Sequence, residues 1–278
     1  MLTVLPKNAS LTQTGTEGEW SKVVYNGQTG YIRSDLLAPD AAAASPAPAA
    51  VSQETEPAPA ATTPAPAVTG GHIICIDPGH QRKGDSTKEP NGPGSTTMKA
   101  RVTGGTRGGT TGVYEYELNL NVSLKLRDEL VRRGYTVYMT RETHDINISN
   151  MERAQFATAH GAEISVRIHA NGSTNTGVSG ALTLTPSAGN PYIPNLAGAS
   201  QKLSSCVLSS YCAATGMKNQ GVQASDTMTG INWCTMPVTI LEMGYMTNPA
   251  DDTNMENADY QAKMVKGIAD GIDAYFAS

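Results

Sequence analysis

Residues 115–168 read EYELNLNVSLKLRDELVRRGYTVYMTRETHDINISNMERAQFATAHGAEISVRI, and this stretch decides the fold. It opens with a segment whose apolar side chains recur every four residues and which meets a stop signal at Gly134. Those side chains are Leu118, Val122, Leu126 and Leu130. The spacing therefore predicts an amphipathic helix over residues 115–133.

Strand-like and helix-like segments alternate through the rest of the chain from residue 71 onward. Strands are expected over 73–76, 135–140, 164–168, 180–185 and 238–241. Further helices are expected over 150–160, 196–211 and 258–276. Alternation of this kind predicts an α/β domain with a twisted, mostly parallel sheet flanked by helices on both faces.

The composition is that of a globular protein, with 39% hydrophobic and 16% charged residues. A net charge of −5 offers no basic face, so no nucleic-acid partner is expected. No segment approaches the roughly 20 apolar residues of a transmembrane helix, and residues 1–7 do not read as a secretory leader. The four cysteines form no CxxC pair. Cys75 is expected to be buried, and one disulfide among Cys206, Cys212 and Cys234 is left open.

Ionisable side chains stand at the ends of three predicted strands. His80 follows the first of these strands, His169 ends the second and Glu242 ends the third, while Glu115 opens the first long helix. In open sheets of this type, ligands bind beyond the carboxyl ends of the strands, so the four side chains are expected to converge. Two imidazoles, one carboxylate and a position left for water make a catalytic zinc (Zn²⁺) site. Glu242 is the candidate for proton transfer between water and a leaving amine.

Four motifs carry a family resemblance: ICIDPGHQ at 74–81, YEYELNL at 114–120, SVRIHANG at 165–172 and VTILEMGYMTNP at 238–249. Together they resemble the zinc-dependent N-acetylmuramoyl-L-alanine amidases (amidase type 3). The resemblance implies that His80, Glu115 and His169 bind zinc and that Glu242 is catalytic. Glu117 is a competing ligand. About 200° of helix rotation separates it from Glu115, so only one of the two can face the metal, and the family pattern favours Glu115.

Composition divides the chain into three parts. Residues 38–70 hold seven of the sixteen prolines and predict an extended linker. Before them, GEWSKVVYNGQTGYI at 18–32 predicts strands joined by an Asn-Gly hairpin turn and resembles bacterial SH3-like domains. We therefore expect a partial SH3-like domain over 1–37, a linker over 38–70 and a zinc amidase domain over 71–278. The aromatic residues of the first part either fill a small core or bind a ligand.

The resemblance implies a peptidoglycan hydrolase, acting outside the cell or in the cell wall, that cuts between the lactyl group of N-acetylmuramic acid and L-alanine. A zinc carboxypeptidase acting on another stem-peptide amide and a non-catalytic wall-binding protein remain as alternatives, and a monomer is expected. Residues 81–111 are expected to form a basic loop that either walls the groove or is merely solvated. Arg141 and Arg153 are expected to form structural ion pairs near the crevice, with a substrate contact by Arg141 as the alternative. Structural roles are expected for His72, His144 and His160.

Overall fold

The computed structural model describes residues 12–17, 20–25, 28–33 and 71–278. The chain divides into two compact units, Met1–Ala61 and Thr62–Ser278. The first unit holds a three-stranded antiparallel sheet of β1 (Thr12–Glu17), β2 (Trp20–Tyr25) and β3 (Gln28–Arg33). Tyr25 pairs with Gln28, which confirms the predicted hairpin between β2 and β3. The SH3-like assignment stays a prediction, and the predicted linker over 38–70 lies outside the described residues.

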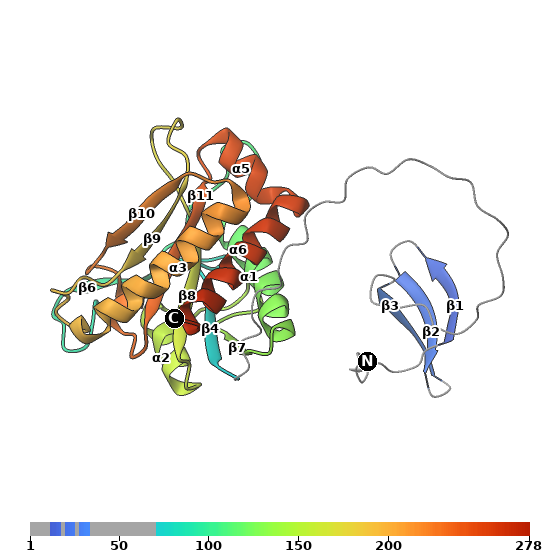
Figure 1. Ribbon diagram of the computed structural model, residues 1–278, viewed down its shortest axis with the longest axis horizontal. Coiled ribbons are helices and arrows are strands. Elements are labelled where there is room, and N and C mark those ends of the chain that lie inside the picture. Colours follow the sequence, from blue (N-terminus) through green and yellow to red (C-terminus); the bar gives the residue numbers. More distant parts are fainter. Residues whose placement is uncertain (1–11, 18–19, 26–27, 34–70) are drawn as a thin grey trace. The chain divides into compact units, whose positions relative to one another are not determined.

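The second unit is built on a six-stranded sheet in the order β10-β9-β11-β8-β4-β7 (Figure 1). Its strands are β4 (Ile73–Pro78), β7 (Thr136–Met139), β8 (Ile164–Asn171), β9 (Ala181–Thr185), β10 (Asn219–Ala224) and β11 (Val238–Tyr245). Neighbouring strands are parallel except at β9 and β11, which run antiparallel. The expectation of a mostly parallel sheet is confirmed.

Helices cover both faces of this sheet, as expected. One face packs against α1 (Glu115–Arg132), α3 (Ala197–Thr215) and α6 (Ala258–Phe276), which lie in front of the strands in Figure 1. The other face packs against α2 (Asn150–Ala159) and the short α4 (Thr229–Asn232). A short 3-10 turn, η2 (Pro194–Leu196), precedes α3, and α5 (Pro249–Glu256) precedes α6. No helix among the described residues is long and apolar enough to cross a membrane.

The alternation of side chains along the strands decides which residues face the functional side. In β8, the side chains of Ile164, Val166 and Ile168 enter the large core under α1, α3 and α6. Because successive strand residues point to opposite faces, Arg167 and His169 point toward the side of α2 and α4. Arg167 and His169 therefore share one face of the sheet.

Three strands, β5, β6 and β10, were not predicted from the sequence. The segment 81–111 is not a simple loop, because it contains an antiparallel hairpin of β5 (Asp85–Pro90) and β6 (Met98–Val102). The edge strand β10 was missed too. Both regions are polar, and β10 carries Gly221 at φ 90°, so neither shows the apolar alternation that marks a half-buried strand.

Candidate active site

His80 is placed by a tight turn at the end of β4. Its own φ of 59° lies in the left-handed region, and the preceding Gly79 packs directly on the ring of His169. A Cβ atom on Gly79 would stand 2.3 Å from that ring, so no larger residue fits there without displacing it. The His80 Nδ1 lies 2.9 Å from the carbonyl oxygen of Thr103. This hydrogen bond fixes the ring and leaves Nε2 directed into the site.

Glu115 is the first residue of α1, and its carboxylate is buried. The backbone N–H groups of Thr106 and Ala170 donate to it at 2.8 and 3.2 Å, and the Asn119 amide donates at 3.2 Å. The neighbouring Glu117 has a different task, because its carboxylate accepts a hydrogen bond from the Tyr114 N–H at 3.1 Å. Glu117 therefore caps the helix, and only Glu115 faces the imidazoles.

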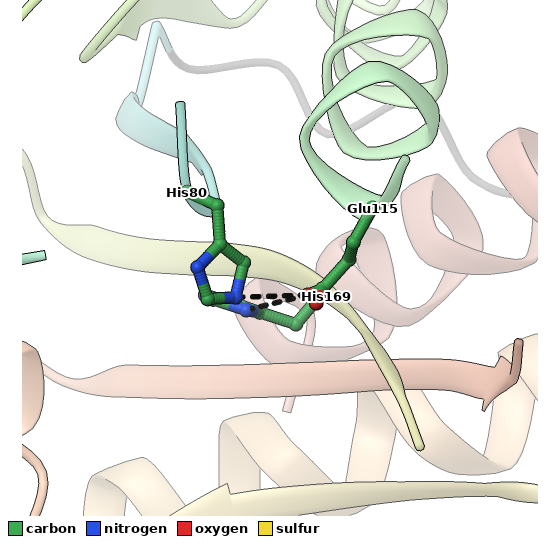
Figure 2. A group of neighbouring side chains, drawn as sticks. All are labelled: His80, Glu115 and His169. Atoms are coloured by element: carbon green, nitrogen blue, oxygen red, sulfur yellow. Dashed lines mark hydrogen bonds and ion pairs between the residues drawn. The ribbon is translucent and has the colours of Figure 1, made fainter. Parts of the chain in front are cut away.

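His80, Glu115 and His169 point toward one another, from the end of β4, the start of α1 and the end of β8 (Figure 2). One carboxylate oxygen of Glu115 lies 3.1 Å from Nε2 of His80 and 3.1 Å from Nδ1 of His169. Burial alone would raise the pKa of Glu115, but the hydrogen bonds with the two histidines hold it well below its usual value. Burial lowers the pKa of His169 to about 4, which keeps this imidazole neutral at pH 7.

These donors fit a divalent cation. All three ligand atoms lie within 4.8 Å of one another. Because the His80 Nδ1 is taken up by the Thr103 carbonyl, Nε2 is the ring atom left to bind a metal beside the Glu115 carboxylate. The Nε2 of His169 is buried and has no hydrogen-bond partner. Two neutral imidazoles and one carboxylate are the donor set of catalytic zinc sites.

Glu242 lies beside this cluster on the neighbouring strand. In the parallel register of β11 and β8 it pairs with His169. Both residues, together with His80, line a cavity of about 370 Å³. Burial raises the pKa of Glu242 to about 8; the charge of Glu115 adds to the increase, and Arg167 opposes it. A carboxyl group with this pKa exchanges protons readily near neutral pH.

A buried charge cluster beneath the site was missed by the sequence analysis. Asp77 is 1% exposed and binds Arg153 at 2.6 Å and Arg167 at 2.7 Å. Burial acts to raise the pKa of Asp77, but the two guanidinium groups hold it far below its usual value. The sequence did contain a signal: Arg167 interrupts an apolar strand two residues before His169, hence on the same face.

Of the two arginines expected to form structural ion pairs, only Arg153 does so. Arg153 forms the predicted ion pair, whereas Arg141 donates to the carbonyl oxygens of Pro78, Gly79 and Tyr116 at 2.9, 3.0 and 2.7 Å. Arg141 thereby anchors the turn before His80 to the first residues of α1.

The remaining histidines and the cysteines lie outside the cluster. His72 pairs with Glu163 at 2.8 Å, and His160 hydrogen-bonds the Phe156 carbonyl at 2.8 Å. The ring of His144 packs edge-on against Tyr116. All four cysteines are free, with Cys75 and Cys234 buried, so the disulfide left open by the sequence is absent.

Comparison with known proteins gives one consistent family. The family described as N-acetylmuramoyl-L-alanine amidase matches residues 74–274. An uncharacterized protein of Bacillus subtilis, YqiI, is 30% identical over 165 residues, which are 59% of this chain and 76% of YqiI. The N-acetylmuramoyl-L-alanine amidase LytC of the same organism is 25% identical over 74% of this chain, a stretch that spans only 36% of LytC.

A solved structure has the same fold. The crystal structure of the N-acetylmuramyl-L-alanine amidase Ami1 from Mycobacterium smegmatis superposes with a TM-score of 0.67 at 25% identity. The match covers 74% of this chain and 97% of Ami1. The family match over residues 74–274 spans the part of the α/β unit that carries His80, Glu115, His169 and Glu242.

Proposed function

Because this chain belongs to the N-acetylmuramoyl-L-alanine amidase family, we propose that it is a zinc-dependent peptidoglycan hydrolase. Its substrate would be the amide between the lactyl group of N-acetylmuramic acid and L-alanine of the stem peptide. The observation that carries the proposal is the convergence of His80, Glu115 and His169 next to Glu242 in one cavity. We infer the extracellular side or the cell wall as its place of action, since the substrate lies there.

In this proposal, His80, Glu115 and His169 hold the metal. A bound zinc ion would supply Lewis acidity, lowering the pKa of a coordinated water and polarising the scissile carbonyl. The chain's own contribution is orientation. The Thr103 carbonyl fixes the His80 ring, and three donors from Thr106, Asn119 and Ala170 fix the Glu115 carboxylate.

Glu242 moves the proton in this proposal. An amine is a poor leaving group unless it is protonated, so a group must take a proton from the attacking water and deliver it to the leaving nitrogen. Glu242 lines the cavity that His80 and His169 also line, and its pKa near neutrality suits both halves of the transfer. No other glutamate or aspartate lines this cavity among the described residues.

The N-terminal unit is proposed as a partial SH3-like domain that accompanies the hydrolase. Its three-stranded antiparallel sheet agrees with an all-β domain. The catalytic unit carries the whole metal cluster, so hydrolysis itself should not need this N-terminal unit.

The products of wall digestion test the proposal. Purified peptidoglycan treated with the zinc-loaded protein should yield stem peptides with a free L-alanine amine and glycan with an unmodified lactyl carboxylate, both identified by mass spectrometry. Release of terminal D-alanine would instead indicate a carboxypeptidase. Intact walls would indicate a binding protein. As a control, Glu142→Gln, at a carboxylate 60% exposed on the surface, should digest walls like the unchanged protein.

A further inference from the structure

We propose that Lys99 and Arg167 form a carboxylate-binding subsite that holds the stem peptide, so that the peptide side of the substrate occupies the cavity beside Glu242. The inference rests on the proposed function and adds to it the direction in which the substrate lies. Two cations and one acid, Glu242, are the charged residues that line this cavity. The acid is already assigned to proton transfer, whereas neither Lys99 nor the free Nη1 of Arg167 has a protein partner among the described residues.

Lys99 comes from the β5–β6 hairpin, whose strand β6 lines part of the cavity. It lies on β6 opposite Glu89, but the Glu89 carboxylate turns to α2 and accepts from the Met151 N–H at 3.1 Å. Among the described residues, Lys99 has no carboxylate within ion-pair distance and no hydrogen-bond partner for its ammonium. Its side chain is only partly exposed and lines the cavity. The ammonium is therefore available to an anion in the cavity.

Arg167 comes from the floor of the cavity and is held rigidly. Its Nε donates to Asp77 at 2.7 Å and its Nη2 donates to Asn150 at 2.8 Å. Its guanidinium packs on Gly230, where a Cβ atom would stand 1.5 Å from Nη1. Among the described residues, Nη1 has no hydrogen-bond partner. A fixed guanidinium with one free donor binds a carboxylate at little cost in conformational entropy.

The charge of the buried cluster supports this reading. Arg153 and Arg167 share the single carboxylate of Asp77, so two positive charges face one negative charge. Of these two arginines Arg167 lines the cavity, and Asp77 compensates its charge only in part, so Arg167 and Lys99 together outnumber the one lining acid, Glu242. An anion entering the cavity would be bound by both cations and partly shielded from solvent.

The chemistry of the substrate indicates which side of the scissile amide, glycan or peptide, occupies the cavity. The N-acetylated sugars on the glycan side offer hydroxyls and uncharged amides, whereas the stem peptide carries free carboxylates. The cavity also presents the apolar side chains of Leu184, Met228 and Ile240, which suit an alanine methyl group. Both features match the peptide side, so the glycan would leave the site on the side away from Lys99.

The test compares two muramoyl tripeptides that differ only at the second residue, whose α-carboxylate is free in one and amidated in the other. In Lys99→Gln, kcat/KM should fall about tenfold or more for the free carboxylate, mainly through KM, since hydrogen bonds to charged groups have this strength. The amidated substrate should change less than about twofold. Lys99→Arg should retain the preference. The matched control is Lys88→Gln, an exposed lysine on the same hairpin that does not line the cavity, and it should leave both rates unchanged.

The outcomes separate this inference from the proposed function. Equal losses on both substrates, no loss on either, or the same loss in Lys88→Gln would overturn the carboxylate subsite. The amidated substrate also reports whether Lys99→Gln is folded and active. If the unchanged protein cuts neither tripeptide, the proposed function fails instead.

Discussion

Replacing Asp77 with asparagine should destabilise the catalytic unit more than any surface change of the same kind. Asp77 is 1% exposed, and its two carboxylate oxygens accept from Arg153 and Arg167 at 2.6 and 2.7 Å. An amide keeps the size of the side chain but removes the charge, which leaves two buried guanidinium groups uncompensated. Removing one partner from a buried ion pair costs about 3–5 kcal/mol, so the free energy of unfolding should fall by that amount.

Urea denaturation followed by far-ultraviolet circular dichroism measures this loss, because the helices of the described residues all lie in the second unit. The matched control is Asp128→Asn, whose carboxylate is 70% exposed beside Arg127. An exposed ion pair of this kind contributes about 0–1 kcal/mol. A loss below about 1 kcal/mol for Asp77→Asn would refute the reasoning, since it would mean that the two arginines do not depend on this carboxylate.

The pH dependence follows from the depressed pKa of Asp77. A carboxyl group whose pKa is lower in the folded than in the unfolded protein stabilises the fold above its unfolded pKa, near 3.9, and that stability is lost as the pH falls. The difference in unfolding free energy between the unchanged protein and Asp77→Asn should therefore be full at neutral pH and shrink below about pH 4. A difference that grows toward acid pH would contradict the assignment.

Three further changes test other parts of the site. Gly79→Ala should displace the His169 ring and lower the rate of hydrolysis about 100-fold, because a misplacement of about 1 Å can cost that much. The control is Gly71→Ala, where an added Cβ would meet no atom within 4 Å and the rate should not change. Equal rates for the two variants would contradict the packing argument. Glu242→Gln should abolish hydrolysis and leave zinc bound, as measured by metal analysis, whereas loss of the metal would move Glu242 into the coordination shell. Deletion of residues 1–70 should leave hydrolysis of a soluble muramoyl peptide unchanged, and an unfolded product in circular dichroism would speak against independent folding.

Long apolar periodicities made most of the fold predictable. The helices over 115–133, 150–160 and 258–276 were located from sequence, because signals such as the fourfold apolar spacing of α1 and its stop at Gly134 are local. The hairpin β5–β6 could not be predicted in this way. Its strands are polar and mostly not buried. They are stabilised by contacts with distant parts of the chain, such as the hydrogen bond between Glu89 and Met151.

The candidate site was predictable where residues end strands and not where they lie within them. His80, His169 and Glu242 were found because strand ends meet at one edge of a sheet. The cluster of Asp77, Arg153 and Arg167 was missed, because its members come from two strands and a helix and no local pattern links them. The family pattern already favoured Glu115 over Glu117, and the coordinates add a physical reason, the capping hydrogen bond of Glu117.

The most direct test of the account is the zinc stoichiometry of the purified full chain and of three variants. The unchanged protein and Glu117→Gln should each bind one zinc ion per chain, while His80→Ala and Glu115→Gln should bind the ion far more weakly and lose hydrolysis with it. If either of these last two variants kept a full equivalent of zinc and full activity, the metal centre would have to lie elsewhere.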